Sequence, residues 1–266
     1  MAASARLAPA RDQESYRVEP HTWQTSLWAR VVRRIGRRWV ISRHVQRYCR
    51  PFRVEGRDRL RGVHGPALII VNHTSHFDTV VALHVLPENI RSKTTIAAAA
   101  DKFYRRSKRG WWFSLFYNAF PIDRRGGGAT TLSYPLSLLK RGWSVLIYPE
   151  GTRSTTGEMG AFHHGVSILA LQARVPVIPI YTTGLPAVMP KGHRTPRPAP
   201  VRARIGAPVW VNDAGSVPEA TARLERAMHA LASEHHAPPH AAAATLSVQH
   251  KTRVRVTKTL TGARRG

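Results

Sequence analysis

A histidine and an aspartate five positions apart follow the first apolar run of the chain. His73 and Asp78 come directly after residues 67–71, a short run rich in branched side chains that is typical of a buried strand. Residues 79–86 continue as an apolar segment that Pro87 ends, which predicts a helix. An imidazole oriented by a carboxylate can take a proton from a hydroxyl group. The pattern therefore indicates acid–base chemistry on a substrate that carries a hydroxyl.

Polar residues also follow two later strand-like runs, at 120–122 and 144–148. They are Arg124, Glu150, Gly151, Thr152 and Arg153. Loops at the carboxyl ends of parallel strands converge on one crevice. Arginine suits bidentate contacts with phosphate, and the backbone N–H groups of Gly151 and Thr152 could add donors for an anion. Together these groups suggest chemistry on the hydroxyl of a phosphorylated molecule.

Each of these groups also has a simpler explanation. Asp78 could cap the helix that follows it, and residues 149–151 could form only a turn. A metal site built from His73, His76 and Asp78 matches no standard zinc spacing. The one cysteine, Cys49, excludes cysteine-based metal sites within the chain, and we interpret it as a structural residue of a helical segment.

The alternation of strand-like and helical segments predicts the fold class. It favours an α/β domain with a central, mostly parallel sheet flanked by helices. The prolines of residues 175–181 suit an edge or irregular strand. Expected strands lie at 53–56, 67–71, 94–100, 120–122, 144–148, 175–181 and about 201–211, and expected helices at 79–86, 129–140, 164–173 and after the capping-box pattern that begins at Ser216.

Residues 21–50 have a helical pattern with one apolar face. Trp28, Val32, Ile35 and Trp39 share that face, and arginines fill much of the rest. Such a helix suits the surface of an anionic bilayer, where apolar burial and basic charge both contribute. The alternative is a helix packed on its own domain with a solvated basic face. The aromatic segment 111–117 is expected to be core, with an acyl-chain wall or a second membrane contact as alternatives.

The charge balance points to an anionic partner. Lysine and arginine number 41 against 15 acidic residues, which gives a net charge of +26. A membrane surface, a nucleic acid or an acidic substrate would suit this charge. A basic nucleic-acid-binding protein is the alternative of another class. It is disfavoured because the arginines concentrate in the first helix, the proline-rich loop and the tail, outside the strand-end site, so no specific nucleic acid is expected.

Hydropathy and composition predict the location and the domain organisation. No run of 18 apolar residues and no apolar N-terminal segment occurs, so we expect neither a transmembrane helix nor a signal peptide. The expected location is peripheral, on the cytoplasmic face of a membrane. The predicted organisation is a disordered arm at 1–20, a basic amphipathic helical segment at 21–50, an α/β domain at 51–236 and a disordered basic tail at 237–266.

Four segments, taken in order, resemble the glycerolipid acyltransferase family, which includes the 1-acylglycerol-3-phosphate O-acyltransferases. They are Asn72-His73 with Asp78, Phe120-Pro121-Ile122-Asp123-Arg124, Tyr148-Pro149-Glu150-Gly151-Thr152-Arg153-Ser154 and Val175-Pro176-Val177-Ile178-Pro179. The resemblance covers about residues 54–212. Tyr148 stands where the family usually has phenylalanine, and His163 and His164 stand where it often has lysine, so charge there depends on pH.

This resemblance implies an acyl transfer to a hydroxyl. His73 would take the proton of the acceptor hydroxyl, Asp78 would orient the imidazole, and the hydroxyl would attack an acyl thioester. The residues implied in binding the acceptor are Arg124, Glu150, Gly151, Thr152 and Arg153, with the arginines on its phosphate. No metal and no other cofactor is implied, since acyl-CoA or acyl-carrier protein is the donor substrate.

The resemblance reports the reaction better than the acceptor. We expect lysophosphatidic acid as the acceptor and phosphatidic acid as the product, with another lysolipid or a glycolipid as the alternative acceptor. The expected partners are a membrane surface with anionic lipids, the lysophospholipid and the acyl donor. A catalytically inactive membrane-binding module is a further alternative, against which the His73–Asp78 pair counts.

Overall fold

A computed structural model describes residues 22–99, 107–122, 129–190, 192–193 and 195–236. The chain divides into two compact units, Met1–Met228 and His229–Gly266. Of the second unit, the description covers only the end of the last helix. The predicted arm at 1–20 and the predicted tail at 237–266 lie outside the described residues, and the predicted domain boundaries stay predictions.

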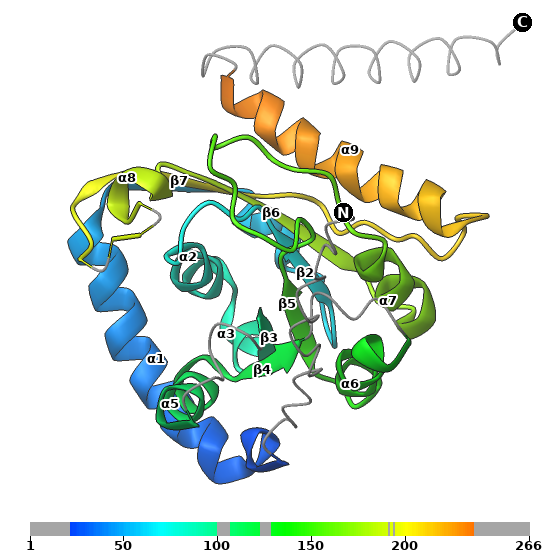
Figure 1. Cartoon of the computed structure of the whole chain (residues 1–266), viewed down its shortest axis with the longest axis horizontal. Helices are drawn as coiled ribbons and strands as arrows, with labels where there is room; N and C mark the ends of the chain where they lie inside the picture. Colours follow the sequence, from blue (N-terminus) through cyan, green and yellow to red (C-terminus); the bar gives the residue numbers. More distant parts are fainter. Residues whose placement is uncertain (1–21, 100–106, 123–128, 191, 194, 237–266) are drawn as a thin grey trace, which may run out of the picture. The chain divides into compact units, whose positions relative to one another are not determined.

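One sheet of seven strands, in the order β1-β7-β6-β2-β5-β3-β4, organises the first unit (Figure 1). Every neighbouring pair is parallel except β6 with β7, which is antiparallel. The predicted fold class, an α/β domain with a mostly parallel sheet, is confirmed. The strands are β1 (Cys49–Glu55), β2 (Leu68–Val71), β3 (Thr94–Ala99), β4 (Ala119–Ile122), β5 (Ser144–Ile147), β6 (Val177–Thr183) and β7 (Ala199–Ile205).

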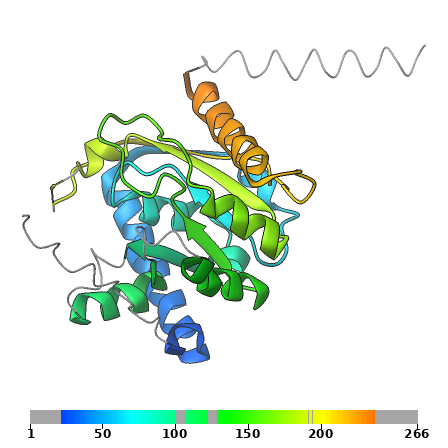
Figure 2. The ribbon, with the colours of Figure 1, turned by 45° about the vertical axis from the view of Figure 1, so that its right-hand side comes forward.

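Helices cover both faces of this sheet (Figures 1 and 2). In Figure 1, α1, α2 and α5 lie on one side of the strands, and α6 and α7 lie on the other. The helices are η1 (Thr22–Thr25), α1 (Leu27–Tyr48), η2 (Arg57–Leu60), α2 (Asp78–Val85), α3 (Glu88–Arg91), α5 (Ser107–Tyr117), α6 (Ala129–Lys140), α7 (Gly165–Ala173), α8 (Leu185–Val188) and α9 (Val217–His236).

Strand β2 lies in the interior of the sheet, between β6 and β5. All four of its residues are fully buried, which is why its sequence is apolar throughout rather than alternating. Ile70 pairs with Ile147 of β5, so the carboxyl ends of these two strands are adjacent. The chain leaves β2 toward β3 on one side and leaves β5 toward β6 on the other, an arrangement that opens a crevice at the strand ends.

The expectation that residues 175–181 form an edge or irregular strand is wrong, because β6 pairs on both sides. Proline is tolerated here for a local reason. The N–H of Val177 points toward the β7 side, where it donates to Val209, and the missing N–H of Pro179 would point the same way. Pro179 still takes part in the pairing on that side through its carbonyl, which accepts from the N–H of Gly206, just after β7 (2.8 Å).

Helix α1 is one continuous helix, and its apolar face points away from the domain. Leu27 and Trp39 are 75% and 74% exposed, and the residues between them on that face are exposed as well. The opposite stripe of the helix is buried and consists of Ala29, Arg33, Arg37, Ile41 and Val45. Each of the first four follows an apolar-face residue by two positions, which is a rotation of about 200° around the helix. The predicted apolar face exists, and it is the outward-facing side of the helix.

Two arginines of α1 lie in its buried stripe, which contradicts the alternative of a wholly solvated basic face. Arg33 and Arg37 are 2% and 5% exposed. Arg37 donates to the carbonyl oxygens of Phe116 (3.1 Å), Arg91 (3.0 Å) and Tyr117 (2.8 Å). Burial lowers the pKa of Arg37 to about 9 and that of Arg33 to about 10. The inward side of α1 is thus held by charged side chains that pair with backbone oxygens.

Other local predictions have mixed outcomes. Ser216 Oγ accepts a hydrogen bond from the N–H of Glu219 (3.3 Å), whose carboxylate accepts one from Gly215, which confirms the capping pattern before α9. Cys49 begins β1 rather than lying in a helix, and burial raises its pKa to about 12. Of the aromatic segment 111–117, Phe116 and Tyr117 pack against the core as expected, whereas Trp112 is 64% exposed. None of the described helices is both long enough and apolar enough to cross a membrane.

Candidate active site

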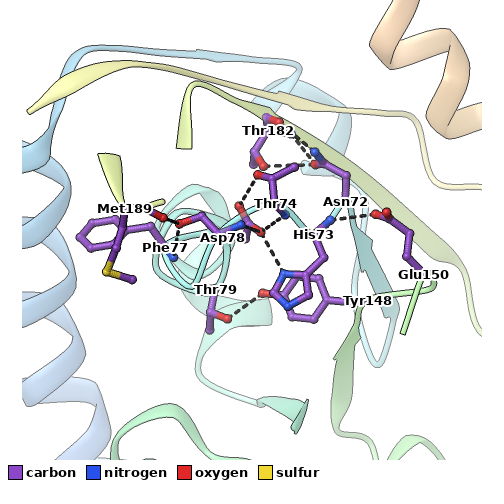
Figure 3. A network of polar contacts seen from close by, with 11 residues as sticks. Asn72, His73, Thr74, Phe77, Asp78, Thr79, Tyr148, Glu150, Thr182 and Met189 are labelled. Atoms are coloured by element: carbon purple, nitrogen blue, oxygen red, sulfur yellow. Dashed lines mark hydrogen bonds and ion pairs between the residues drawn. The ribbon is translucent and has the colours of Figure 1, made fainter. Parts of the chain in front are cut away.

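The side chains of His73 and Asp78 form a direct pair at the carboxyl end of β2. His73 Nδ1 lies 3.0 Å from Asp78 Oδ2 (Figure 3). Asp78 is completely buried, whereas 17% of the His73 side chain remains exposed. Because Nδ1 is engaged by the carboxylate, Nε2 is the ring nitrogen left to act on a substrate. The pair therefore has the arrangement of a carboxylate-oriented general base.

Asp78 also organises the loop between β2 and α2. Its Oδ2 accepts hydrogen bonds from the N–H groups of Thr74 (2.6 Å) and Ser75 (2.8 Å), and its Oδ1 lies 3.3 Å from the hydroxyl of Thr74. These donors precede α2, and the N-cap of α2 is Phe77, without a side-chain cap. The idea that Asp78 only caps the following helix is wrong. Its carboxylate instead accepts hydrogen bonds from the loop that precedes the helix and contacts the ring of His73.

Asn72 attaches the same loop to β6. Its side-chain N–H donates to the carbonyl of Thr182 (2.9 Å), and its Oδ1 accepts from the N–H of Thr182 (2.7 Å). A side-chain amide therefore continues the β2–β6 ladder one step beyond Val71, whose partner is Ile180. This bond places the backbone of His73 at a fixed point above the sheet.

Glu150 connects three loop segments through its carboxylate. Oε1 accepts from the N–H of His73 (2.8 Å), and Oε2 accepts from the N–H of Gly160 (2.9 Å). In the same region the N–H of Ser154 donates to the carbonyl of His73 (2.8 Å). Burial raises the pKa of Glu150, although the two N–H donors partly oppose this. Both oxygens thus already have backbone partners, and the expected contact of Glu150 with the acceptor stays a prediction.

Gly151 sits where a side chain would not fit. Its φ of +66° is in the left-handed region, and an added Cβ would lie 2.9 Å from the imidazole of His163. The N–H of Gly151 donates to the carbonyl of Tyr148 (3.0 Å). The turn itself therefore uses this N–H, and the expected donation from Gly151 to an anion stays a prediction.

A cavity of about 760 Å³ opens beside the pair. The polar residues of its lining include His73, Glu150, Thr152, Arg153, His163 and His164, and the apolar ones include Ile96, Ala97, Ala98, Ile122, Leu132, Ile147, Val166 and Ile168. The lining thus offers groups that suit a phosphorylated headgroup and groups that suit an aliphatic chain. The structure thus brings five predicted residues, His73, Glu150, Gly151, Thr152 and Arg153, to one cavity, with Asp78 directly behind His73. Arg124 lies outside the described residues.

Sequence reasoning missed several residues of this site. His44 of α1 lines the cavity, and its ring lies 6.3 Å from that of Phe77. Tyr148 stacks on His73, and its hydroxyl lies 2.6 Å from that of Thr79. No spacing rule predicts contacts between segments this far apart in the chain. The one available signal was the position of Tyr148 as the last residue of an expected strand.

The donor set of this region does not suit a metal. Among the residues that the structure describes, no group of three histidine, cysteine, aspartate or glutamate side chains is placed to hold an ion. The oxygens of Asp78 are occupied by backbone donors and by His73.

Curated relatives share part of the chain. The 1-acyl-sn-glycerol-3-phosphate acyltransferase of Cocos nucifera is 30% identical over 156 residues, which are 55% of this chain and 47% of that protein. The human 1-acyl-sn-glycerol-3-phosphate acyltransferase beta is 29% identical over 144 residues, 53% of this chain and 50% of that protein. The chain thus spans about half the length of these curated relatives.

A solved structure and a family model agree with this similarity. The crystal structure of the 1-acyl-sn-glycerophosphate acyltransferase PlsC from Thermotoga maritima has a TM-score of 0.61 and 21% identity, over 79% of this chain and 81% of that one. At this identity the likeness concerns the fold. The model of the acyltransferase family matches residues 51–183, half of the chain, a range that contains the His73–Asp78 pair and the Glu150 segment. On this match, the chain belongs to the acyltransferase family.

Proposed function

We propose that this protein transfers a fatty acyl group from an acyl thioester to the hydroxyl of lysophosphatidic acid and so forms phosphatidic acid. The observation that carries the proposal is the His73 Nδ1 to Asp78 Oδ2 contact of 3.0 Å at the wall of the cavity. The names of the relatives from coconut and human support the acceptor. The donor would be acyl-CoA or acyl-carrier protein.

In this proposal His73 acts as the general base. Nε2 takes the proton of the acceptor hydroxyl as its oxygen attacks the thioester carbonyl. The imidazolium that forms is stabilised by Asp78, which lies at Nδ1. When the tetrahedral intermediate collapses, the carbon–sulfur bond breaks and the leaving thiolate takes the proton from Nε2. The products are the new ester and the free thiol, and no enzyme nucleophile is needed.

The walls of the cavity suit the two parts of such a substrate. Arg153 and His163 are among its polar lining residues, and a guanidinium can bind a phosphate through two N–H groups. The apolar lining residues, which include Ile96 and Leu132, would contact the aliphatic chain. We assign the acceptor phosphate to Arg153, with Thr152 beside it. The role expected for Arg124 remains part of the proposal.

The exposed face of α1 supports a membrane partner. Trp28, Ile35 and Trp39 are 52%, 61% and 74% exposed, and this is too much apolar surface for a solvated helix. Trp23 links α1 to α5, since its ring centroid lies 5.6 Å from both Trp28 and Trp111. Arginines of α1 flank the apolar stripe, as a helix on an anionic bilayer requires. We propose that this face rests on the membrane that supplies the lysolipid.

The test of the reaction is acyl transfer on liposomes with wild type, His73→Ala and His64→Ala. His64 is an exposed histidine outside the cavity and serves as the matched control. We expect the first variant to lose roughly two to four decades of rate and the control to lose none. Equal rates for His73→Ala and wild type would refute the mechanism. Comparing lysophosphatidic acid with a monoacylglycerol, in wild type and Arg153→Ala, tests the assignment of the phosphate.

The test of the membrane face is liposome binding by wild type and Trp39→Glu. We expect binding to uncharged and to anionic vesicles, with a component that salt does not remove, and a large loss in the variant. Binding that high salt abolishes and that the substitution leaves unchanged would contradict a role for this face. It would instead favour binding through basic charge alone, which a parallel assay with DNA would examine.

A further inference from the structure

The aromatic ring of Tyr148 covers one face of the His73 imidazole. The two ring centroids are 3.9 Å apart and the ring planes are inclined by 20°, and Figure 3 shows one ring lying over the other. This is closer than the separation of about 4.5–7 Å that is usual for aromatic pairs. Tyr148 directly follows the last residue of β5, the strand that pairs with β2, so two neighbouring strands bring the rings together.

The hydroxyl of Tyr148 fixes the ring in place. It lies 2.6 Å from the hydroxyl of Thr79, the residue that follows Asp78 at the start of α2. Burial, with a smaller contribution from Asp78, raises the pKa of Tyr148 well above its ordinary value. The phenol therefore stays protonated and does not compete with His73 as a base. The ring is thus held between β5, which precedes Tyr148, and α2, which carries both Thr79 and Asp78.

The electrostatics of this stack change when His73 is protonated. The face of an aromatic ring is the negative pole of its quadrupole and attracts a cation whose centre lies within about 6 Å of the ring centroid. Asp78 stabilises the imidazolium at Nδ1, Glu150 binds the backbone N–H of His73, and Arg153 and His163 line the same cavity. The ring adds a stabilising contact that the neutral imidazole receives only weakly.

We propose that Tyr148 is a positioning residue that holds the His73 imidazole flat against its ring and stabilises the imidazolium formed when His73 takes the acceptor proton. This inference rests on the proposed function, because it needs His73 to act as the base. The competing explanation is that Tyr148 only fills space behind His73. The two explanations differ in what they expect when the shape of the ring is kept and its electron density is reduced.

The experiment replaces Tyr148 by phenylalanine, by phenylalanines with one, two or three ring fluorines, and by leucine, in the full chain. Fluorine withdraws electrons from the ring face and changes its size little. We expect Tyr148→Phe to retain kcat within about twofold to threefold, since the ring remains, and each fluorine to lower kcat further by about twofold, with KM unchanged. Tyr148→Leu should lose about tenfold or more. The matched control is the same series at Tyr134, whose ring packs on Phe120 outside the cavity.

A second measurement does not depend on turnover. The fraction of His73 that is protonated at a fixed pH, read from its ring resonances in isotopically labelled protein, should fall in the same order along the fluorinated series. Melting temperatures that stay constant along the series would exclude a loss of fold. Failure of His73→Ala to lose activity would refute the proposed function, whereas the resonance series would still report on the stack.

Two results would overturn the inference while leaving His73 as the base. One is a flat series, in which kcat and the protonated fraction do not depend on the number of fluorines and only leucine reduces activity. That result would show that the ring contributes shape alone. The other is wild-type activity in Tyr148→Leu, which would show that the stack has no part in the reaction.

Discussion

Replacing Asp78 by asparagine should remove a charge while leaving the geometry of the site in place. Oδ2 of Asp78 accepts from the N–H groups of Thr74 and Ser75 as well as facing His73 Nδ1, so three donors meet one oxygen. In Asp78→Asn we expect the amide oxygen to occupy the position of Oδ2, because an NH₂ group at that position would face the N–H groups of Thr74 and Ser75, which are also donors. The NH₂ group then takes the place of Oδ1, beside the hydroxyl of Thr74, which can accept from it.

The expected loss is therefore the Coulomb attraction between the carboxylate and the imidazolium that forms in the reaction. For charges about 4 Å apart at an effective dielectric constant of about 20, this attraction is about 4 kcal/mol. Lost from the transition state alone, it corresponds to about a thousandfold in kcat. A flipped amide would also impose the wrong imidazole tautomer and should reduce kcat by about ten thousandfold.

The assay is single-turnover acyl transfer on liposomes, combined with the proton resonance of the His73 Nδ1–H group. We expect a loss of about three decades, with the Nδ1–H resonance retained because the tautomer is unchanged. Asp213→Asn, which makes the same change in an exposed aspartate paired with Arg223, is the control and should act as wild type. A loss below about tenfold in Asp78→Asn would refute the charge argument, and disappearance of the Nδ1–H resonance would refute the argument about the amide.

Three further predictions concern stability. Arg37→Gln should lower the free energy of unfolding, measured by urea titration, by about 2 kcal/mol or more, because buried carbonyls lose their donors. Arg34→Gln breaks only an exposed ion pair with Glu88 and should change the free energy of unfolding by less than about 1 kcal/mol. Equal effects of the two substitutions would contradict the role of burial. Gly151→Ala should be more destabilising than Gly157→Ala, since both have positive φ but only the first Cβ meets a neighbour, and similar midpoints would show that this contact relaxes. Burial raises the pKa of Glu150 in the folded state above its unfolded value of about 4.3, so the contribution of this residue to stability is full below about pH 4.3 and decreases as the pH rises through the folded-state pKa. The difference in unfolding free energy between wild type and Glu150→Gln should decrease over the same pH range. A difference that does not change with pH would contradict this expectation.

The strand ends were predictable because β2 and β5 are short, buried and apolar, and because parallel strands must present their carboxyl ends at one edge. That reasoning placed His73 and Glu150 together before any contact was known. It could not show that the carboxylate of Glu150 binds two backbone N–H groups, since Gly160 lies on a loop without any periodic pattern. The pairing of β6 on both sides was missed because it depends on which residue lies opposite Pro179, and the sequence does not show the register between β6 and β7.

The first helix shows a second limit of sequence patterns. Apolar and basic stripes were visible along α1, and the apolar stripe lies on the outer side, where the helix expected at a bilayer surface needs it, but the arginines were expected to face headgroups or solvent. The buried stripe instead contains Arg33 and Arg37, whose partners are carbonyl oxygens. Backbone oxygens carry no signal in the sequence. The pattern of side chains along a helix therefore cannot reveal which of its faces will bind backbone oxygens.

The partners of Arg37 also constrain the order in which the chain can assemble. Its guanidinium binds the carbonyl oxygens of residues that lie up to 80 positions later, and β1, which follows α1, pairs with β7, the last strand of the sheet. At a synthesis rate of about 5–20 residues per second, Tyr117 leaves the ribosome roughly 4–16 seconds after Arg37. During this interval Arg37 lacks two of its three carbonyl partners, those of Phe116 and Tyr117, because only the carbonyl of Arg91 is made earlier. A nascent chain that ends before α5 therefore contains α1 without the carbonyl oxygens of Phe116 and Tyr117 that bind Arg37 on its buried side.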